Sequence, residues 1–179
     1  MNVEWRIWVK AAGLVCVFAS CVLTGIELER RMKFRWMVLS EMREVLVILE
    51  KEMVFHHADI PEAFASAAMG CRTVLREVLE SAAAQAEQRN GDAFERIWRT
   101  AVAEKIPEKL LTPGELLALQ NTAEALCTTD TVMQRTLLQK NADRFLEMGK
   151  TEEQNYREKG GLVRRLMTAA GAFLAILLI

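Results

Sequence analysis

Two apolar segments, one near each end of the chain, place the strongest constraint on how this sequence can fold. Residues 11–26 (AAGLVCVFASCVLTGI) carry no charge, and Ile7–Val9 extend the segment beyond Lys10. Together they make roughly 20 residues, the length that a helix needs to cross the hydrocarbon core of a bilayer. Residues 166–179 (LMTAAGAFLAILLI) carry no charged side chain, and from residue 169 onward they have no polar face. Each end therefore predicts a transmembrane helix.

The basic residues around these segments predict an orientation in the membrane. Basic side chains follow the first segment at Arg30, Arg31, Lys33 and Arg35 and precede the second at Arg157, Lys159, Arg164 and Arg165. Because basic loops stay on the cytoplasmic side of a membrane, we expect both termini to be extracytoplasmic. The predicted domains are an N-terminal transmembrane helix (1–28), a cytoplasmic helical bundle (29–160) and a C-terminal transmembrane helix (161–179).

The N-terminal segment has two other interpretations. A cleaved signal peptide would end in an A-x-A-like site, and no such site closes the apolar stretch. Phe18-Ala19-Ser20-Cys21 places small residues before a cysteine, as a lipoprotein signal does, although Phe18 is bulkier than such signals usually carry. The alternative is therefore a membrane-anchored sensor or lipoprotein-type interaction protein with an extracytoplasmic helical domain.

The sequence between the apolar ends has helical periodicity throughout. The clearest apolar face lies within residues 38–53 and consists of Val38, Leu39, Met42, Val45, Leu46, Leu49 and Met53. Later segments repeat this spacing, and the alternation typical of strands is absent. A helix after Pro113 is expected to turn Leu126 and Cys127 inward. Six helices with short connections predict an all-α fold, an antiparallel six-helix bundle flanked by one transmembrane helix at each end.

Proline, glycine and capping residues predict where these helices begin and end. Thr112-Pro113-Gly114-Glu115 combines a cap, a proline in the first turn and a glutamate three residues after the cap, which together form a capping box. Asp59-Ile60-Pro61-Glu62 and the pair Asp92 and Glu95 follow the same pattern. The predicted helix stops are Gly70 and Asn90-Gly91, and Gly160-Gly161 is expected to loosen the chain before the last apolar segment.

The charge balance and the known motifs predict neither a nucleic-acid partner nor a catalytic site. The chain has 23 basic and 24 acidic residues with a net charge of −1, and no basic face with interleaved aromatic residues is visible. No two of the 4 cysteines have C-x-x-C spacing, and motifs for phosphate binding or nucleophilic catalysis are absent. We therefore expect no enzymatic activity, no metal and no cofactor.

His56 and His57 are the 2 histidines of the chain and the residues most suited to chemistry. A zinc site needs three or four ligands, and adjacent helical residues point about 100° apart, so the two rings do not readily face one metal. The stretch MVFHHADIPEAF instead predicts a helix end, a turn and a capped helix start. We expect both histidines on the surface at a helix C-terminus, where positive charge is favourable. A metal-dependent enzyme or regulator built on them is the rival class.

Several segments carry a family resemblance. They are Leu49-Glu50-Lys51-Glu52-Met53 with Ile60-Pro61-Glu62-Ala63-Phe64, then Leu111-Thr112-Pro113 with Glu115-Leu116, then Ala125-Leu126 with Asp130, and finally Asn155-Tyr156-Arg157 before the apolar tail. In sequence and order they resemble the stage III sporulation protein AB family, as does the plan of one apolar segment at each end. Ala58-Asp59 departs from the Thr-Pro pair usual in the family, and residues 71–105 match only in pattern.

The resemblance implies a membrane protein of endospore-forming bacteria that belongs to the complex linking mother cell and forespore. It places the protein in the mother-cell membrane around the forespore. Family members have a soluble domain similar to the cytoplasmic domains of the inner-membrane platform protein of type II secretion and type IV pilus systems. The implied partners are other proteins of the stage III sporulation complex, namely the ATPase of the operon and its polytopic membrane components. A homo-oligomer is left open.

A helical domain that is anchored at both ends and lacks catalytic motifs predicts a non-enzymatic scaffold. Its expected role is that of an adapter between a cytoplasmic ATPase and the membrane platform. Partners would bind the polar faces of the first and last helices of the bundle. The candidate contact residues on these faces are Glu41, Glu44, Arg135, Lys140 and Arg144.

Overall fold

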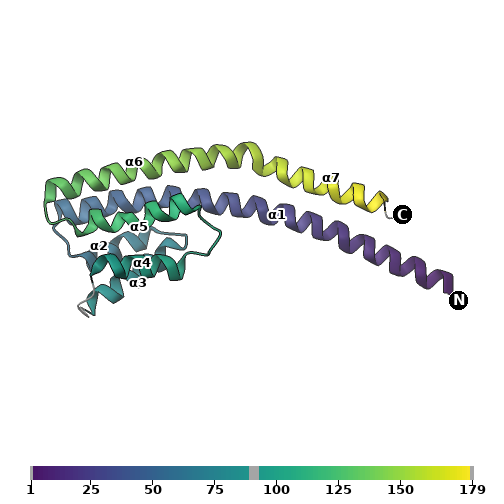
Figure 1. Cartoon of the computed structure of the whole chain (residues 1–179), viewed down its shortest axis with the longest axis horizontal. Helices are drawn as coiled ribbons and strands as arrows, with labels where there is room; N and C mark the ends of the chain where they lie inside the picture. Colours follow the sequence, from purple (N-terminus) through teal and green to yellow (C-terminus); the bar gives the residue numbers. More distant parts are fainter. Residues whose placement is uncertain (1, 89–92, 178–179) are drawn as a thin grey trace. The chain divides into compact units, whose positions relative to one another are not determined.

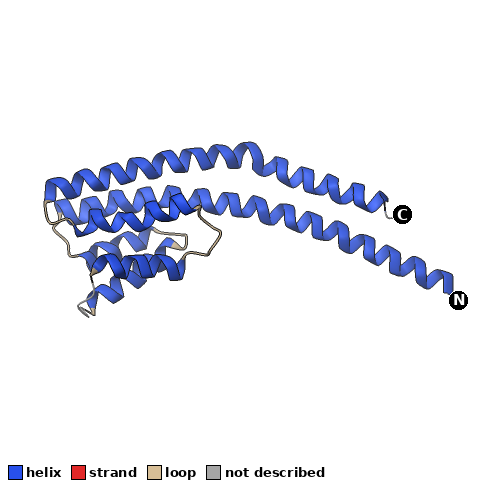
Figure 2. Ribbon diagram, viewed as in Figure 1, coloured by secondary structure: helices blue, strands red, loops and turns tan. Residues whose placement is uncertain are grey.

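The computed structural model describes residues 2–88 and 93–177, and every regular element within them is helical (Figures 1 and 2). The prediction of an all-α chain is confirmed for these residues. In chain order the α-helices and the π-helical turns η1 and η2 are α1 (Asn2–Glu50), η1 (Lys51–Phe55), α2 (Ile60–Gly70), α3 (Leu75–Glu87), α4 (Phe94–Lys105), α5 (Pro113–Cys127), α6 (Thr131–Asn155), η2 (Tyr156–Gly160) and α7 (Gly161–Leu177).

The chain divides into two compact units. The central unit is Phe34–Thr151, and the terminal unit combines Met1–Lys33 with Glu152–Ile179. The central unit contains the second part of α1, the helices α2 to α5, and most of α6. The first part of α1, the end of α6 and α7 belong to the terminal unit. The predicted domains 1–28, 29–160 and 161–179 stay predictions.

In the central unit, α6 runs antiparallel beside the second part of α1 (Figure 1). Near one end of this contact, a Cβ added to Gly149 would lie 3.2 Å from Oγ of Ser40. Near the other end, Nε of Arg135 lies 3.2 Å from Oε1 of Glu50. The remaining helices pack in sequence, α2 on α3, α3 on α4 and α4 on α5.

The apolar face predicted within residues 38–53 forms the α1 side of the core. Its members that are at most 1% exposed are Val38, Leu39, Met42, Val45, Leu46 and Leu49. Met53, in η1, is partly buried against the same core. Burying one leucine or valine side chain stabilises a fold by about 1.5–3 kcal/mol, so this face accounts for the position of α1 in the unit.

Trp98 of α4 is the largest fully buried side chain among the described residues, with 0% exposure. Its ring packs edge-on against Phe64 of α2, with centroids 5.6 Å apart, and Phe64 packs in the same way against Phe94 at 5.5 Å. The indole Nε1 donates a hydrogen bond to the carbonyl oxygen of Leu119 in α5 at 2.8 Å. Three helices therefore meet at one aromatic cluster whose buried polar group is satisfied.

The start of α5 confirms the predicted capping box. The backbone N–H of Glu115 donates to Oγ1 of Thr112 at 3.4 Å, and the N–H of Thr112 donates to Oε2 of Glu115 at 2.8 Å. At α2 the prediction is only partly right, because Asp59 occupies the N-cap position but its side chain makes no capping hydrogen bond. The box predicted at Asp92 and the stop at Asn90-Gly91 lie outside the described residues.

The stretch MVFHHADIPEAF forms the predicted helix end, turn and helix start. Helix α1 ends in η1, where the N–H of His56 donates to the carbonyl of Lys51 at 3.2 Å. The N–H of Ala58 then donates to the carbonyl of Glu52 at 3.0 Å. Between them His57 adopts a left-handed conformation with φ 55°, the conformation in which helices commonly end. The turn at His57 leads the chain into α2.

The prediction that Gly160-Gly161 loosens the chain is wrong. Tyr156–Gly160 wind as η2, and α7 begins at Gly161 without a break. Gly160 is buried, and a Cβ on it would lie 3.1 Å from Cδ2 of Tyr156 and 3.6 Å from Cγ of Glu29. Glycine at this position serves close packing within the terminal unit instead of flexibility.

Among the described residues, no helix combines the length and the apolarity that are needed to cross a membrane. This finding does not support the two transmembrane helices expected from the sequence. Large apolar side chains of the terminal unit are exposed to solvent in this structure, among them Trp8, Val15, Leu23, Leu166, Phe173 and Ile176.

Candidate partner-contact site

Glu41, one of the five predicted contact residues, is engaged within the central unit. Its carboxylate accepts hydrogen bonds from the backbone N–H of Arg72 at 2.5 Å and of Thr73 at 3.0 Å, and from the Thr73 hydroxyl. These donors lie just before α3, where backbone N–H groups have no helical acceptor. Glu41 therefore secures the corner between α2 and α3 from its position on α1.

Arg135 also has partners inside the central unit. Its Nε lies 3.2 Å from Oε1 of Glu50, which accepts a second hydrogen bond from Nε2 of Gln139 at 2.7 Å. The guanidinium carbon lies 5.4 Å from the centroid of the Phe55 ring, a cation–π contact. The Arg135 side chain is half exposed, so it joins α6 to the end of α1 while still facing solvent.

Glu44, Lys140 and Arg144 are exposed. Lys140 and Arg144 are one helical turn apart, so they share a side of α6, and Glu44 lies on the part of α1 that runs beside α6 (Figure 1). The structure therefore separates the five predicted residues into two with partners inside the unit and three that face solvent. We call these three the α1–α6 charge surface.

The histidine corner is a surface feature, as predicted. Both rings are exposed, and Nδ1 of His56 lies 2.9 Å from Oε2 of Glu52, one turn earlier. The hydrogen bond with His56 holds the pKa of Glu52 below its usual value. Among the described residues, no three side chains of His, Cys, Asp or Glu gather closely enough to hold a metal ion.

Arg35 and Glu115 form a bidentate ion pair that the sequence analysis did not predict. Nε and Nη2 of Arg35 donate to the two carboxylate oxygens of Glu115 at 3.0 and 2.8 Å. Burial raises the pKa of Glu115, but the hydrogen bonds from Arg35 and Thr112 outweigh it and hold that pKa below its usual value. One carboxylate thus closes the capping box of α5 and ties α5 to α1. Arg35 was assigned to the basic flank of a membrane segment, so its charge alone gave no signal for this pairing.

The cysteines of the central unit differ in accessibility. Cys71 is buried, and burial together with the nearby charges of Glu41 and Glu44 raises the pKa of its thiol to about 12. Cys127 was expected to face inward, but it is exposed at the last residue of α5. The helical face was correctly identified around Leu126, which is 2% exposed, and Cys127 lies about 100° further round the helix.

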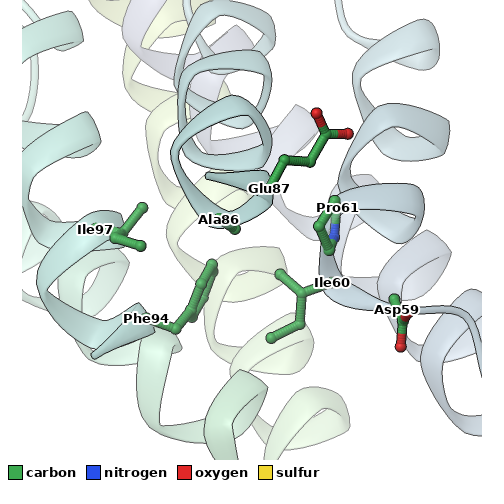
Figure 3. A pocket seen from close by; sticks show the side chains of 7 residues that line it. All are labelled: Asp59, Ile60, Pro61, Ala86, Glu87, Phe94 and Ile97. Atoms are coloured by element: carbon green, nitrogen blue, oxygen red, sulfur yellow. The ribbon is translucent and has the colours of Figure 1, made fainter. Parts of the chain in front are cut away.

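An open pocket of about 450 Å³ lies where α2 begins, α3 ends and α4 begins. Figure 3 shows Ile60, Phe94 and Ile97 within it and the carboxylates of Asp59 and Glu87 at its margins. Pro61 and Ala86 complete the lining. The pocket offers an apolar surface with acidic edges.

The chain matches a protein-family model described as "Stage III sporulation protein AB" over residues 10–179. It is also similar to a solved structure titled "Stage III sporulation protein AB (SpoIIIAB)", with a TM-score of 0.57 and 16% sequence identity. That similarity covers 71% of this chain and 94% of the solved chain, and at this identity it bears on the fold alone. No curated protein gives a significant match.

Proposed function

The chain belongs to the stage III sporulation protein AB family, and from this premise we propose that it is a membrane-anchored, non-enzymatic scaffold of a sporulation complex. The terminal unit would anchor the chain in the mother-cell membrane around the forespore. The central unit would present its charged surface to an ATPase and to polytopic membrane proteins of the same complex. Membership in the family supports a role in a sporulation complex, and the anchor and the adapter role are parts of this proposal.

The observation that carries this proposal is the concentration of exposed large apolar side chains in the terminal unit. In the terminal unit, large side chains such as Trp8 at 74% and Phe173 at 65% exposure are apolar. In the central unit, most apolar side chains gather in a core around Trp98, although a few such as Met69 and Val132 are exposed, and α1 and α6 also carry exposed charges. Helices with many exposed apolar side chains suit a bilayer, and a packed unit with exposed charges suits protein partners.

The anchor and its orientation predict how the cysteines react in cells. In a variant with Cys16→Ala and Cys21→Ala, we expect Cys127 to be protected from a membrane-impermeant maleimide in intact cells and to react after lysis. Cys71 should react only after the chain is unfolded, because it is buried. Labelling of Cys127 from outside intact cells would favour the alternative with an extracytoplasmic helical domain.

The α1–α6 charge surface predicts where a partner binds. Reversing its charges with Glu44→Lys, Lys140→Glu and Arg144→Glu should weaken a contact that depends on complementary charge. We expect recovery of the operon's ATPase with the affinity-purified chain to fall at least about tenfold, equivalent to about 1.4 kcal/mol, and spore yield to fall with it. The free energy of unfolding should change by less than about 0.5 kcal/mol per substitution, since these side chains are exposed.

A matched control lies at the end of α4 and just beyond it. Glu104→Lys, Lys105→Glu and Lys109→Glu change the net charge equally at exposed positions and should leave recovery and spore yield unchanged. Normal recovery with the α1–α6 variant would exclude this surface. Turnover of a nucleotide or another substrate by the purified chain would contradict the scaffold as a whole.

A further inference from the structure

Within the terminal unit, α1 and α7 approach each other so closely that a Cβ would be crowded at two glycine positions. A Cβ added to Gly25 of α1 would lie 2.9 Å from Cβ of Met167 and 3.4 Å from Cα of Arg164. A Cβ added to Gly171 of α7 would lie 3.0 Å from Cβ of Cys21. Each helix thus contributes a glycine to the contact, and the two glycines lie at different levels along it.

The contact continues toward the end of the unit that carries charge. Nη1 of Arg164 lies 3.2 Å from Oε2 of Glu29, and a Cβ on Gly160 would lie 3.6 Å from Cγ of the same glutamate. At the other end, the ring of Phe18 lies 3.3 Å from the Cβ position of Gly171. From Phe18 to Glu29 the contact spans about 16 Å of α1 at 1.5 Å per residue.

The serine and threonine hydroxyl groups in this unit are satisfied by backbone carbonyls. Ser20 and Thr24 donate to the carbonyl oxygens four residues earlier in α1, at 2.7 and 2.8 Å, and Thr168 does the same in α7 at 2.9 Å. Leu23 and Leu166 are more than half exposed. Small residues at the contact, satisfied hydroxyls and apolar side chains outside it are the arrangement of helices that pack within lipid.

We propose that this glycine contact pairs the two ends of one chain inside the bilayer, so that the anchor is a single antiparallel hairpin. The motif Cys21-x-x-x-Gly25 has the small-residue spacing through which membrane helices of separate chains can associate. Here α7 of the same chain occupies it, so the motif is not available to a second copy. This inference rests on the membrane anchor proposed above.

Disulfide cross-linking from the native Cys21 tests the pairing. The test variant carries Gly171→Cys with Cys16, Cys71 and Cys127 replaced by alanine, and copper phenanthroline with oxygen accepts the electrons of the two thiols. Because disulfides join Cβ atoms about 3.5–4.5 Å apart, a separation of the helices by about 0.5–1 Å from the 3.0 Å approach is enough. In isolated membranes we expect an intrachain disulfide, seen as a faster-migrating monomer that reverts on reduction.

The matched control keeps Cys16 and replaces Cys21 with alanine in the same background. Cys16 is exposed and lies about 140° around the helix from Cys21, so we expect the intrachain product to fall at least about tenfold, because its Cβ is far outside disulfide distance. Equal cross-linking through Cys16, disulfide-linked dimers through Cys21, or no product in membranes would each overturn the pairing.

A steric variant tests the same contact at a position away from the two cysteines. Adding Gly25→Leu to the test variant should lower the intrachain product at least about tenfold, since the new side chain overlaps Met167 and overpacked contacts force elements apart. Gly13→Leu is the control, because a Cβ on Gly13 meets nothing within 4 Å. If both variants lowered the intrachain product equally, or if neither lowered it, the role of Gly25 would be overturned.

The location of the chain separates this inference from the proposed function. A chain that sediments with membranes but gives no intrachain product would retain the anchor and lose the hairpin. A chain recovered from the soluble fraction would contradict the membrane anchor, and with it the pairing in lipid.

Discussion

Trp98→Ala is expected to lower the free energy of unfolding by about 3–5 kcal/mol, the largest effect of any single substitution considered for this chain. The side chain is fully buried and fills the space between α2, α4 and α5. Its removal leaves a cavity beside Phe64 and leaves the Leu119 carbonyl without its indole donor. Chemical unfolding of the purified chain, followed by circular dichroism, measures the change.

Trp98→Phe is the matched control. Phenylalanine retains an aromatic ring for the contact with Phe64 but removes the donor to Leu119, so we expect a loss of about 1–2 kcal/mol. A cost below about 1 kcal/mol for Trp98→Ala would be too small for a large buried side chain and would contradict the packing described around it.

Glu115→Gln is expected to lower the free energy of unfolding by about 2–3 kcal/mol at neutral pH. Removing one partner of a buried ion pair costs about 3–5 kcal/mol, and the lower value applies because the Arg35 side chain is 27% exposed. Glutamine keeps the size of the side chain but cannot pair with Arg35 as a carboxylate does. The same unfolding measurement applies, with Glu80→Gln as control. Glu80 pairs with Arg76 on the surface, and such pairs contribute less than about 1 kcal/mol.

The pH dependence of this effect has a defined sign. The pKa of Glu115 is lower in the folded chain than its usual value, so its contribution is fully present above the pKa of the unfolded chain. It is lost as the pH falls through the folded-state pKa. The difference in unfolding free energy between the native chain and Glu115→Gln should therefore shrink on acidification. A difference that grows as the pH falls would contradict the assigned shift.

Local signals in the sequence predicted much of the fold. The apolar face of residues 38–53 and the capping box at Thr112 depend on residues within a few positions of each other, and both are found where expected. Asp59 shows the limit of such signals, because a capping side chain at the right position can still adopt another orientation. Gly160 shows a second limit of local signals. In the sequence, a glycine that permits close packing looks the same as a glycine that interrupts a helix.

The candidate site was less predictable for a physical reason. Sequence periodicity places Glu41 and Arg135 on polar faces, but it does not indicate whether a distant segment supplies a partner. Glu41 accepts hydrogen bonds from residues 31 and 32 positions away, and Arg135 pairs with a residue 85 positions away. Arg35 and Glu115 are separated by 80 positions. Such pairs follow from how the helices pack, which no local pattern encodes.

The π-helical turn η2 sets the rotational phase of α7 within the terminal unit. A π-helical turn behaves as an α-helix with one inserted residue, and one residue corresponds to about 100° of rotation. Both sequence neighbours of Gly171 are alanines, Ala170 and Ala172. If Tyr156–Gly160 wound as an ordinary α-helix, an alanine would turn toward Cys21, where its methyl group at 3.0 Å would be crowded. The winding of five residues therefore decides which side chain meets α1 about three turns further along the chain.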